Sequence, residues 1–498
     1  MRRPLIGAVL VLGLLAAMIA AAVTAKTNSA TAAATVRPSI TDAQRVSTGT
    51  TPPTEAQCNA VGRTCFTPQA LYSAYNIGPL HASGLTGAGT TIAIVDSWGS
   101  DTMAHDLHVF DQAFGLPPMC GEEGVTCAPG MPTFSVLHPN GAPATKQQSG
   151  SGTGQEDKTL WAIEVALDVE MAHATAPGAN IVLVASTGAE TLGVQGLPNM
   201  MKAEKSLIDS GRVNVISQSF GTAEDAFGSS ASLLNLRDAF KAAAANGVTV
   251  LASSGDDGSS GQKKSPVATG GTYFSFPVVG WPASDPLVTA VGGTYLCTDP
   301  FATANQPRTN GTNRASRCNA FPNETEVGWT FSGGGFSHVF AKPDYQNTLP
   351  AGSTPIGSTR GVPDVAYQAS AGTGALIYLS LPPDGNDSNV ADTTSGWWDI
   401  GGTSLSTPQW AGLVAIADQI NGGGLGLINP ALYKIGADPA RYAADFFDVT
   451  TGNNTDTVDP PTPVTGYPAT RGWDPVTGLG TPNAARLLPD LVAAAHGH

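Results

Sequence analysis

The sequence predicts an α/β fold in which a central, mostly parallel sheet is flanked by helices. Three observations support this prediction. Short apolar segments recur along the chain, their hydrophobicity is continuous rather than alternating, and helical patterns lie between several of them. Continuous apolar strands are typical of parallel sheets that are buried on both faces. The alternation of such strands with helices is typical of α/β architecture.

The expected elements follow one another in a regular order. We predict strands at residues 90–97, 180–186, 213–220, 247–255 and 287–293. Helical patterns occupy residues 160–174 (LWAIEVALDVEMAHA) and 233–247 (LLNLRDAFKAAAANG), and Gly247 is placed to cap the end of the second. A further helix is expected to begin near Thr407 or Pro408. In folds of this kind the catalytic groups lie at the carboxyl ends of the strands.

Composition limits the class of protein. The chain has 498 residues, of which 41% are hydrophobic, and this suits one large or two ordinary globular domains. Only 13% of the residues are charged and the formal net charge is -15. No nucleic-acid partner is expected, because few cations are available to neutralise phosphates. A sparse, acidic charge set also favours tolerance of acid.

The first residues predict export. Residues 1–25 combine two arginines, a long apolar run and small residues up to Ala25, which is the layout of a secretory signal peptide cleaved after Ala25. The alternative is an uncleaved anchor, since residues 5–25 carry no charge and nearly reach the length of a bilayer span. We expect a secreted, extracellular monomer with no stable membrane association after cleavage. Residues 26–65 are predicted as a linker or short pro-segment, because residues 26 to about 56 are polar and lack periodicity.

The six cysteines fall into three pairs of near neighbours in the sequence. An even number of cysteines on an exported chain predicts disulfides. Proximity favours three local bridges, although fifteen pairings are formally open, and no CxxC spacing indicates zinc. The expected bridges are Cys58–Cys65, Cys120–Cys127 and Cys297–Cys318.

Residues 401–415, GGTSLSTPQWAGLVA, place Ser404 in a small-residue turn that leads into a helix. The amide-rich start of a helix carries a partial positive charge, which stabilises a developing oxyanion. Ser404 is therefore a candidate nucleophile. The alternative is a serine that only caps the helix.

Two carboxylates stand out in the helical pattern of residues 160–174. Glu164 and Asp168 are four residues apart and so share one face of a helix that is otherwise almost entirely apolar. Two acids in a buried helix are unfavourable unless they share a proton or find donors. We interpret this pair as functional, and we interpret Glu170 and the preceding Glu156 and Asp157 as a solvated acidic stripe.

These motifs and several others resemble the sedolisin family of serine-carboxyl peptidases, which have a subtilisin-like three-layer fold. The resemblance covers residues 66 to about 485 and is carried by the ExxxD pair followed by HATAPGANI, then SQSFG, SSGDDG, FPVVGWPASDPLVTAVGGT, SGGGFS, PDVAY and GTSxSxP in that order. It implies that residues 66–498 form a peptidase catalytic domain acting on proteins or peptides. It also assigns the catalytic residues, namely Glu164, Asp168, Asp256 and Ser404.

The resemblance implies a distinct chemistry. Glu164 would accept the serine proton, Asp168 would orient Glu164 and share its proton, and a protonated Asp256 would stabilise the oxyanion. Asp257 is not chosen, because the family pattern is Gly-Asp-x-Gly. Activity is expected to be highest at acidic pH and to fade as Asp256 ionises. Asp96, at the end of the first strand, is interpreted as a structural or peripheral acid.

Two rival functions remain open. A neutral subtilisin-like peptidase would need a histidine base, but no His-Gly-Thr motif is present, and the histidines are interpreted as surface or packing residues. A secreted binding protein could keep the same scaffold without turnover. Proximity of Ser404, Glu164 and Asp256 in space would favour the enzyme over the binding protein.

Two further sites follow from the resemblance. The stretches FFDVTTGNN and ATRGWDPVTGLGTP are similar to the carboxy-terminal calcium site of the family. They imply one structural calcium ion held by oxygens, with the ligands Asp448, Val449, Thr470, Gly472 and Asp474. Residues 219–221 and 332–335 resemble the strips along which a substrate peptide lies as an added strand, and the alternative for both is tight packing under glycine-rich loops.

Overall fold

The structure is a computed structural model that describes residues 37–38, 41–139, 154–186, 197–264, 272–297, 318, 320–321, 323–380, 395–458 and 460–497. All of these residues belong to one compact unit, residues 34–498. The predicted signal peptide, residues 1–25, lies outside the described residues. Within the described ranges, no helix has both the length and the hydrophobicity that a membrane crossing requires.

An eight-stranded sheet forms the centre of the fold. Seven strands lie in the order β13-β12-β8-β6-β3-β5-β4, and an eighth, β16, pairs with β12. All neighbouring strands run parallel except β12 and β13. The strands are β3 Thr91–Ser97, β4 Phe134–Leu137, β5 Asn180–Ser186, β6 Val215–Gln218, β8 Thr249–Ser253, β12 Thr289–Leu296, β13 Glu326–Gly328 and β16 Val365–Gln368.

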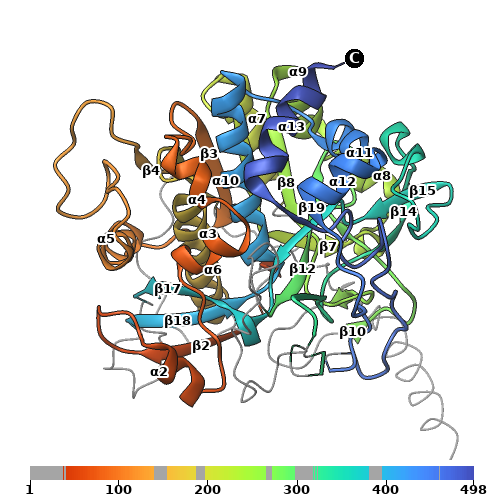
Figure 1. Cartoon of the computed structure of the whole chain (residues 1–498), viewed down its shortest axis with the longest axis horizontal. Coiled ribbons are helices and arrows are strands. Elements are labelled where there is room, and N and C mark those ends of the chain that lie inside the picture. Colours follow the sequence, from red (N-terminus) through yellow and green to blue (C-terminus); the bar gives the residue numbers. More distant parts are fainter. Residues whose placement is uncertain are drawn as a thin grey trace, which may run out of the picture. The chain divides into compact units, whose positions relative to one another are not determined.

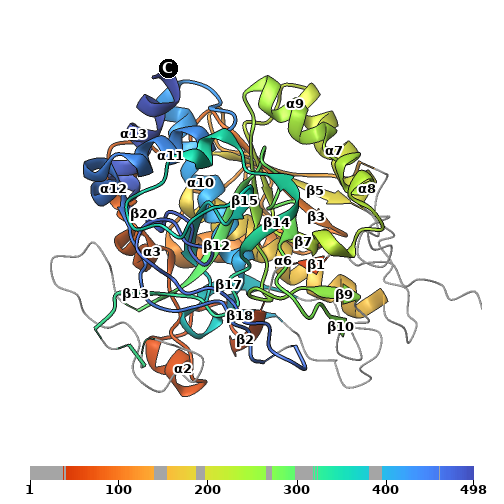
Figure 2. The same cartoon turned by 90° about the vertical axis from the view of Figure 1, so that its right-hand side faces the viewer.

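Helices cover both faces of this sheet (Figure 1). On one face, α6 (Gly154–Thr175) and α10 (Thr403–Asn421) pack against each other and against the strands. On the other face lie α7 (Leu197–Asp209) and α9 (Asp238–Asn246), which the turned view shows across the sheet from α10 (Figure 2). An outer layer on α6 and α10 is formed by α3 Pro68–Ala74, α5 Met103–Phe114 and α13 Ala484–His496.

Shorter elements surround this three-layer arrangement. The remaining helices are α2 Glu55–Ala60, α4 Gly78–Ala82, α8 Ser230–Leu234, α11 Asn429–Ala437 and α12 Pro439–Asp445. The remaining strands are β1 Arg37–Pro38, β2 Thr41–Ser47, β7 Phe220–Ala223, β9 Gln262–Lys264, β10 Thr272–Tyr273, β11 Gly280–Trp281, β14 Gly335–Ala341, β15 Thr359–Val362, β17 Ala375–Leu379, β18 Gly396–Gly401, β19 Phe446–Phe447 and β20 Thr481–Pro482.

The central strands are buried on both faces, as their continuous hydrophobicity predicts. Successive side chains of a strand point to opposite faces of the sheet. In β3, Ile92 and Ile94 join the core under α6 and α10, whereas Ala93 and Val95 join the core under α7 and α9. The predicted α/β fold with a mostly parallel, helix-flanked sheet is therefore confirmed.

Most of the predicted elements match the structure except at their ends, but the helix predicted at residues 233–247 is divided, because α8 ends at Leu234 and α9 begins at Asp238. Gly247 caps α9 in a left-handed conformation with φ of 71°, as expected. The strand predicted at residues 213–220 is interrupted at Ser219, so that β6 ends there and β7 begins. The helix predicted to begin near Thr407 or Pro408 begins at Thr403. Pro408 is therefore the sixth residue of α10 rather than part of its first turn.

Part of the predicted linker, residues 26–65, forms strands. Arg37 and Pro38 (β1) pair antiparallel with β7, and Thr41–Ser47 (β2) pairs antiparallel with β18. The sequence of this segment has no periodicity, and these strands exist because two edges of the catalytic scaffold offer backbone partners. The local sequence of residues 26–65 gives no information about these distant partner strands.

The three predicted disulfides are present. Cys58–Cys65, Cys120–Cys127 and Cys297–Cys318 are bonded across sequence separations of 7, 7 and 21 residues. All six cysteines are thus paired, and the proximity argument gave the correct pairing.

Candidate active site

The residues proposed for catalysis come from three elements that meet at the carboxyl end of the sheet. Glu164 and Asp168 lie on α6, Ser404 lies in the first turn of α10, and Asp256 follows β8. Glu164, Asp168 and Ser404 are completely buried. The charges or hydrogen bonds of Asp168, Ser404 and Asp256 all act on Glu164. The structure therefore brings the four residues together.

Glu164 lies in a strongly desolvated position. Burial, followed by the charges of Asp168 and Asp96, raises the pKa of Glu164 well above its usual range. The Ser404 hydroxyl is close enough to lower this pKa by hydrogen bonding. The best-aligned partner of Ser404 Oγ is, however, the Ser219 carbonyl oxygen at 3.2 Å. Neither carboxylate oxygen of Glu164 has a hydrogen-bond partner of good geometry, so the Ser404 hydroxyl lies near Glu164 but is directed at Ser219 in this structure.

Asp168 is held by Ser219. The Ser219 hydroxyl donates to Asp168 Oδ1 at 2.8 Å. Burial and the charge of Asp96 nevertheless raise the pKa of Asp168 well above its usual range, against the lowering effect of Ser219. Ser219 therefore contacts the nucleophile through its carbonyl and the acid pair through its hydroxyl.

Asp96 is a third acid in this cluster. It lies near the end of β3 and is completely buried. Burial raises its pKa to about 8. Because its charge acts on both Glu164 and Asp168, Asp96 is a member of the buried acidic cluster, and its interpretation as a site acid stays a prediction.

Asp256 and Asp257 have different surroundings. Asp256 Oδ1 accepts from both the backbone N–H and the hydroxyl of Thr403, each at 2.8 Å. Thr403 precedes Ser404, so Asp256 is fixed beside the start of α10. Asp257 Oδ1 instead accepts from Gln262 at 3.4 Å. This contrast agrees with the choice of Asp256 from the sequence pattern.

The backbone before Ser404 requires glycine. Gly402 has φ of 124°, in the region that favours glycine. A side chain at Gly401 would overlap the backbone of residues 369–371. These two glycines therefore let the chain turn sharply from β18 into α10, and Ser404 lies in the first turn, where amide groups have no helical acceptor.

Glu170 was predicted to be solvated, and the structure shows that this is wrong. Glu170 is completely buried, and its Oε2 accepts from the Tyr378 amide at 2.9 Å. The sequence pattern could not reveal this, because β17 covers the exposed face that we assigned to this part of α6. The side chains of Glu156 and Asp157 lie outside what the structure describes.

The described histidines lie outside the candidate site. His173, on the same helix as Glu164, contacts Asp111 Oδ2 and the Pro117 carbonyl, each at 3.0 Å. No histidine in the described part of the chain hydrogen-bonds Ser404. His173 is a buried packing residue, in keeping with its predicted role.

The two predicted substrate strips differ. At residues 332–335 the loop is tightly packed, because a side chain at Gly333 or Gly334 would overlap the backbone of Ser254 or Pro475. The Ser332 hydroxyl bonds the Gly293 amide and the Val476 carbonyl. Residues 219–221, in contrast, lead into β7, whose Phe220 and Gly221 pair with another extended segment of this chain. This second strip accepts an added strand.

The predicted calcium ligands lie in one loop cluster. The Gly472 amide donates to both carboxylate oxygens of Asp448 at 3.1 Å, and the Thr470 amide donates to Asp474 Oδ2 at 3.0 Å. Val449 follows Asp448 directly. Within the described ranges no group of three or more His, Cys, Asp or Glu side chains is arranged for a metal. An ion here would therefore depend on backbone carbonyl oxygens.

The chemistry of these donors fits calcium, which prefers oxygen ligands. The two carboxylates are not equivalent. Asp474 already accepts from the amides of Thr470, Val476 and Thr477 and from the Thr477 hydroxyl. Asp448 accepts backbone bonds only from Gly472, so Asp448 is the carboxylate with more capacity for a cation.

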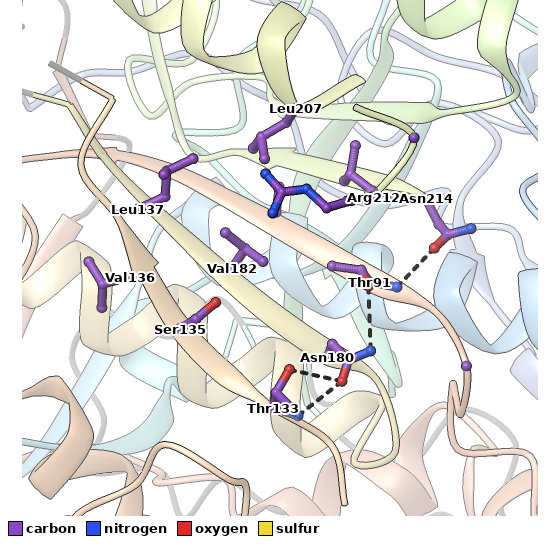
Figure 3. A pocket seen from close by; sticks show the side chains of 14 residues that line it. Thr91, Thr133, Ser135, Val136, Leu137, Asn180, Val182, Leu207, Arg212 and Asn214 are labelled. Atoms are coloured by element: carbon purple, nitrogen blue, oxygen red, sulfur yellow. Dashed lines mark hydrogen bonds between the residues drawn. The ribbon is translucent and has the colours of Figure 1, made fainter. Parts of the chain in front are cut away.

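A pocket of about 640 Å³ lies away from this site (Figure 3). It is lined at one side by Thr91 and Asn180, the first residues of β3 and β5, and by Asn214, which precedes β6. Thr91 and Asn214 are joined by a hydrogen bond of 3.0 Å. Because these are the amino ends of the strands that carry the candidate site at their carboxyl ends, the pocket is separate from that site.

Sequence reasoning missed two residues of the site. Thr403 holds Asp256 through two donors, and Ser219 connects Asp168 with Ser404. Both lie in motifs that were quoted, GTS and SQSFG, but Ser219 was interpreted as a substrate contact. Only the fold shows which side chains these motifs face.

Comparisons with known proteins identify the family of this chain. The Subtilase family model matches residues 153–426. Kumamolisin from Bacillus sp. (strain MN-32) is 33% identical over 444 residues, which is 89% of this chain and 66% of that protein. Tripeptidyl-peptidase 1 from Homo sapiens is 31% identical over 353 residues, which is 68% of this chain and 53% of that protein.

A solved structure extends the likeness to three dimensions. Pseudomonas sedolisin, a serine-carboxyl proteinase complexed with two molecules of pseudo-iodotyrostatin, superimposes with a TM-score of 0.60 at 26% identity, covering 86% of this chain and 98% of that one. The chain spans about two thirds of the length of kumamolisin and about half that of tripeptidyl-peptidase 1. From its motifs, fold and relatives, this chain belongs to the subtilase family, in the sedolisin branch of serine-carboxyl peptidases.

Proposed function

We propose that this chain is a secreted, acid-acting serine-carboxyl endopeptidase that forms an acyl-enzyme on Ser404. The observation that carries the proposal is the convergence of the half-buried Asp256 with the fully buried Ser404, Glu164 and Asp168. A binding scaffold has no need to hold a hydroxyl against a desolvated carboxyl pair. The neutral, histidine-dependent alternative is disfavoured, because no described histidine bonds Ser404.

The first step is attack of Ser404 Oγ on the scissile carbonyl carbon. Glu164 accepts the serine proton, and the raised pKa of Glu164 makes its ionised form a better proton acceptor. Asp168, which is held by Ser219, acts on Glu164 through its charge, and we assign it to titrate jointly with Glu164. Glu164 then returns the proton to the leaving amine, and a water molecule hydrolyses the acyl-enzyme in the reverse sense.

Asp256 is assigned to the oxyanion. Its Oδ1 accepts two bonds from Thr403, so we assign the proton of the neutral carboxyl to Oδ2, which would donate it to the oxyanion. A neutral carboxylic acid that donates to an oxyanion contributes a large share of transition-state stabilisation. Activity should therefore require the protonated form of Asp256 and decline as pH rises towards neutrality.

The acidic cluster supports the same pH dependence. Full ionisation would place the charges of Glu164, Asp168, Asp96 and Asp256 close together, three of them in completely buried positions. Burial and mutual repulsion favour the partly protonated cluster. A calcium ion held by Asp448, Asp474 and the carbonyls of Val449, Thr470 and Gly472 would have a structural role only, remote from these proton transfers.

The deciding experiment is peptide hydrolysis from pH 3 to pH 8 with the parent and with Ser404→Ala. We expect an acidic optimum in the parent and loss of hydrolysis in the variant. Ser406→Ala is the matched control, because Ser406 lies one half-turn on in α10 and its hydroxyl bonds only the carbonyls of Tyr367 and Gln368. Peak hydrolysis near pH 8, or unchanged hydrolysis by Ser404→Ala, would reject the proposal.

Substitution of Asp256 tests the oxyanion role separately. An asparagine can accept from Thr403 and still present a neutral donor at every pH, whereas alanine presents none. We expect Asp256→Ala to lower kcat by about 100-fold or more, and we expect Asp256→Asn to retain some activity whose decline towards neutral pH is flattened. Asp257→Asn should match the parent, since Asp257 bonds Gln262 instead.

A further inference from the structure

The pocket at the amino ends of the strands contains a single charged group among the described residues that line it, the guanidinium of Arg212. Its volume of about 640 Å³ lies within the range of small-molecule sites. Arg212 follows Gly211, whose φ of 66° is left-handed, and its side chain extends into the pocket in the direction of Leu137 (Figure 3). A ligand in this pocket would therefore meet a cation and no described carboxylate.

The donors of Arg212 are only partly used within the chain. Its Nε donates to the Ser210 hydroxyl at 3.2 Å, which favours one direction of the side chain. In the described part of the chain, its two Nη nitrogens have no hydrogen-bond partner. Asp209, the nearest acid in sequence, pairs instead with Lys205 at 2.6 Å. Two Nη donors in one plane match the two oxygens of a carboxylate, so this class of anion fits the pocket.

Apolar side chains form the wall of the pocket beside the guanidinium. Leu137, Val182 and Leu207 line this wall. Leu207 is buried, whereas Leu137 and Val182 are only partly buried against the core under α7 and α9. These two side chains therefore leave apolar surface in contact with water. An apolar group attached to the carboxylate would remove that surface from water, which is favourable.

The other side of the pocket is polar, and its side chains are already bonded to one another (Figure 3). Asn180 Oδ1 accepts from the amide and the hydroxyl of Thr133, each at 3.0 Å, and Asn214 Oδ1 accepts from the Thr91 amide at 3.0 Å. These bonds join neighbouring strands, so this side is formed before a ligand arrives. Ser135 is exposed and lies two positions after Thr133, on the same face of the sheet. Its hydroxyl has no hydrogen-bond partner within the described ranges, so it is available to an amide group.

We propose that this pocket binds the carboxy-terminal residue of a peptide when that residue has an apolar side chain. Arg212 would hold the α-carboxylate, and Leu137, Val182 and Leu207 would contact the apolar side chain. Ser135 would bond the amide group next to the carboxylate. The site is separate from the candidate active site. Peptide hydrolysis by the proposed function would release such carboxylates, but binding here does not require that function.

The apolar wall distinguishes this ligand from a simple inorganic anion. Phosphate or sulfate would contact Arg212 alone, because no second cation lines the pocket among the described residues. An isolated ion pair at an exposed position contributes little affinity. Burial of a leucine-sized side chain adds to the same contact. The carboxylate and the apolar group should therefore be recognised together.

The test is isothermal titration calorimetry with N-acetyl-leucine and the Ser404→Ala chain at pH 5.5, where an α-carboxyl group is ionised. We expect a dissociation constant on the order of 1 mM, which is typical of a ligand of this size. N-acetyl-leucinamide lacks the carboxylate, and acetate lacks the apolar group. Each should bind at least about tenfold more weakly than N-acetyl-leucine.

Substitution of Arg212 tests whether the ligand binds in this pocket. Arg212 is exposed and makes one hydrogen bond within the described chain, so Arg212→Gln should keep the melting temperature of the parent. Its affinity for N-acetyl-leucine should fall by at least about tenfold, whereas Arg212→Lys keeps the charge and should retain part of the affinity. Lys205→Gln is the matched control, because it removes a cation of α7 that does not line the pocket. Its affinity should equal that of the parent.

Equal binding of N-acetyl-leucine and its amide would overturn the proposal, and so would an unchanged affinity in Arg212→Gln or the absence of measurable binding. Acetate binding as tight as that of N-acetyl-leucine would also overturn it, since the pocket would then hold anions without a preference for peptide ends. Binding at the candidate active site would not respond to Arg212. Because the measurement involves no hydrolysis, failure of this proposal and failure of the proposed function are separate outcomes.

Discussion

Glu204 provides a quantitative test of how buried acids set the pH dependence of this fold. It is completely buried on α7, and its Oε1 accepts from Gln218 Nε2 at 2.5 Å. Burial raises the pKa of Glu204 from 4.5 to about 8, against the lowering effect of Gln218. Because the folded-state pKa lies above the unfolded value, the protonated carboxyl contributes full stability below about pH 4.5, and that contribution is lost as pH rises towards 8.

The magnitude follows from the shift. Between pH 4.5 and pH 7 the unfolded chain releases this proton while the folded chain retains it, which lowers the free energy of unfolding by about 3 kcal/mol at 1.36 kcal/mol per pH unit. Glu204→Gln keeps the size of the side chain and its acceptor for Gln218 but cannot titrate. Its free energy of unfolding should therefore rise relative to the parent by about 3 kcal/mol between pH 4 and pH 7.

The assay is denaturant unfolding at pH 4 and pH 7, in the Ser404→Ala background so that self-digestion does not interfere. Glu55→Gln is the control, because it removes a carboxyl group from an exposed position. Its free energy of unfolding should depend on pH as that of the parent does. If Glu204→Gln and the parent lose the same stability between the two pH values, the assigned burial effect on Glu204 is wrong.

Three further predictions concern the site and its support. Ser219→Ala removes the 2.8 Å bond to Asp168, so we expect kcat to fall by about 10-fold to 100-fold with a shifted pH profile. An unchanged pH profile would contradict a positioning role for Ser219. Gly333→Ala places a methyl group against the Ser254 carbonyl. Thermal unfolding should show that the free energy of unfolding falls by at least about 1 kcal/mol. Parental stability in this variant would show that the loop can move to accommodate the methyl group. If calcium binds as proposed, EDTA should lower the melting temperature of the parent but not that of Asp448→Asn, and equal responses would argue against the site.

Local sequence was sufficient for the elements whose signal lies within a few residues. The apolar runs of β3 and β5, the glycine that caps α9 and the three short-range disulfides were all predicted correctly. The apolar helix around the ExxxD pair correctly predicted that Glu164 and Asp168 are buried, whereas their catalytic role stays a prediction. Each of these signals is contained in one segment.

The tertiary structure decided everything that depends on a partner from a distant segment. Glu170 is buried because β17 covers it, and Ser219 holds Asp168 across a separation of 51 residues. The pairing of residues 37–38 with β7 and of residues 41–47 with β18 likewise could not be predicted from their own composition. The periodicity of hydrophobic residues and the residue preferences of turns depend on neighbouring positions, so they can be read from the sequence. The partners of sheet edges and of buried carboxylates come from distant segments, so they are defined only in the folded chain. The sequence therefore determined which groups are available for catalysis, and the fold decided which of them meet.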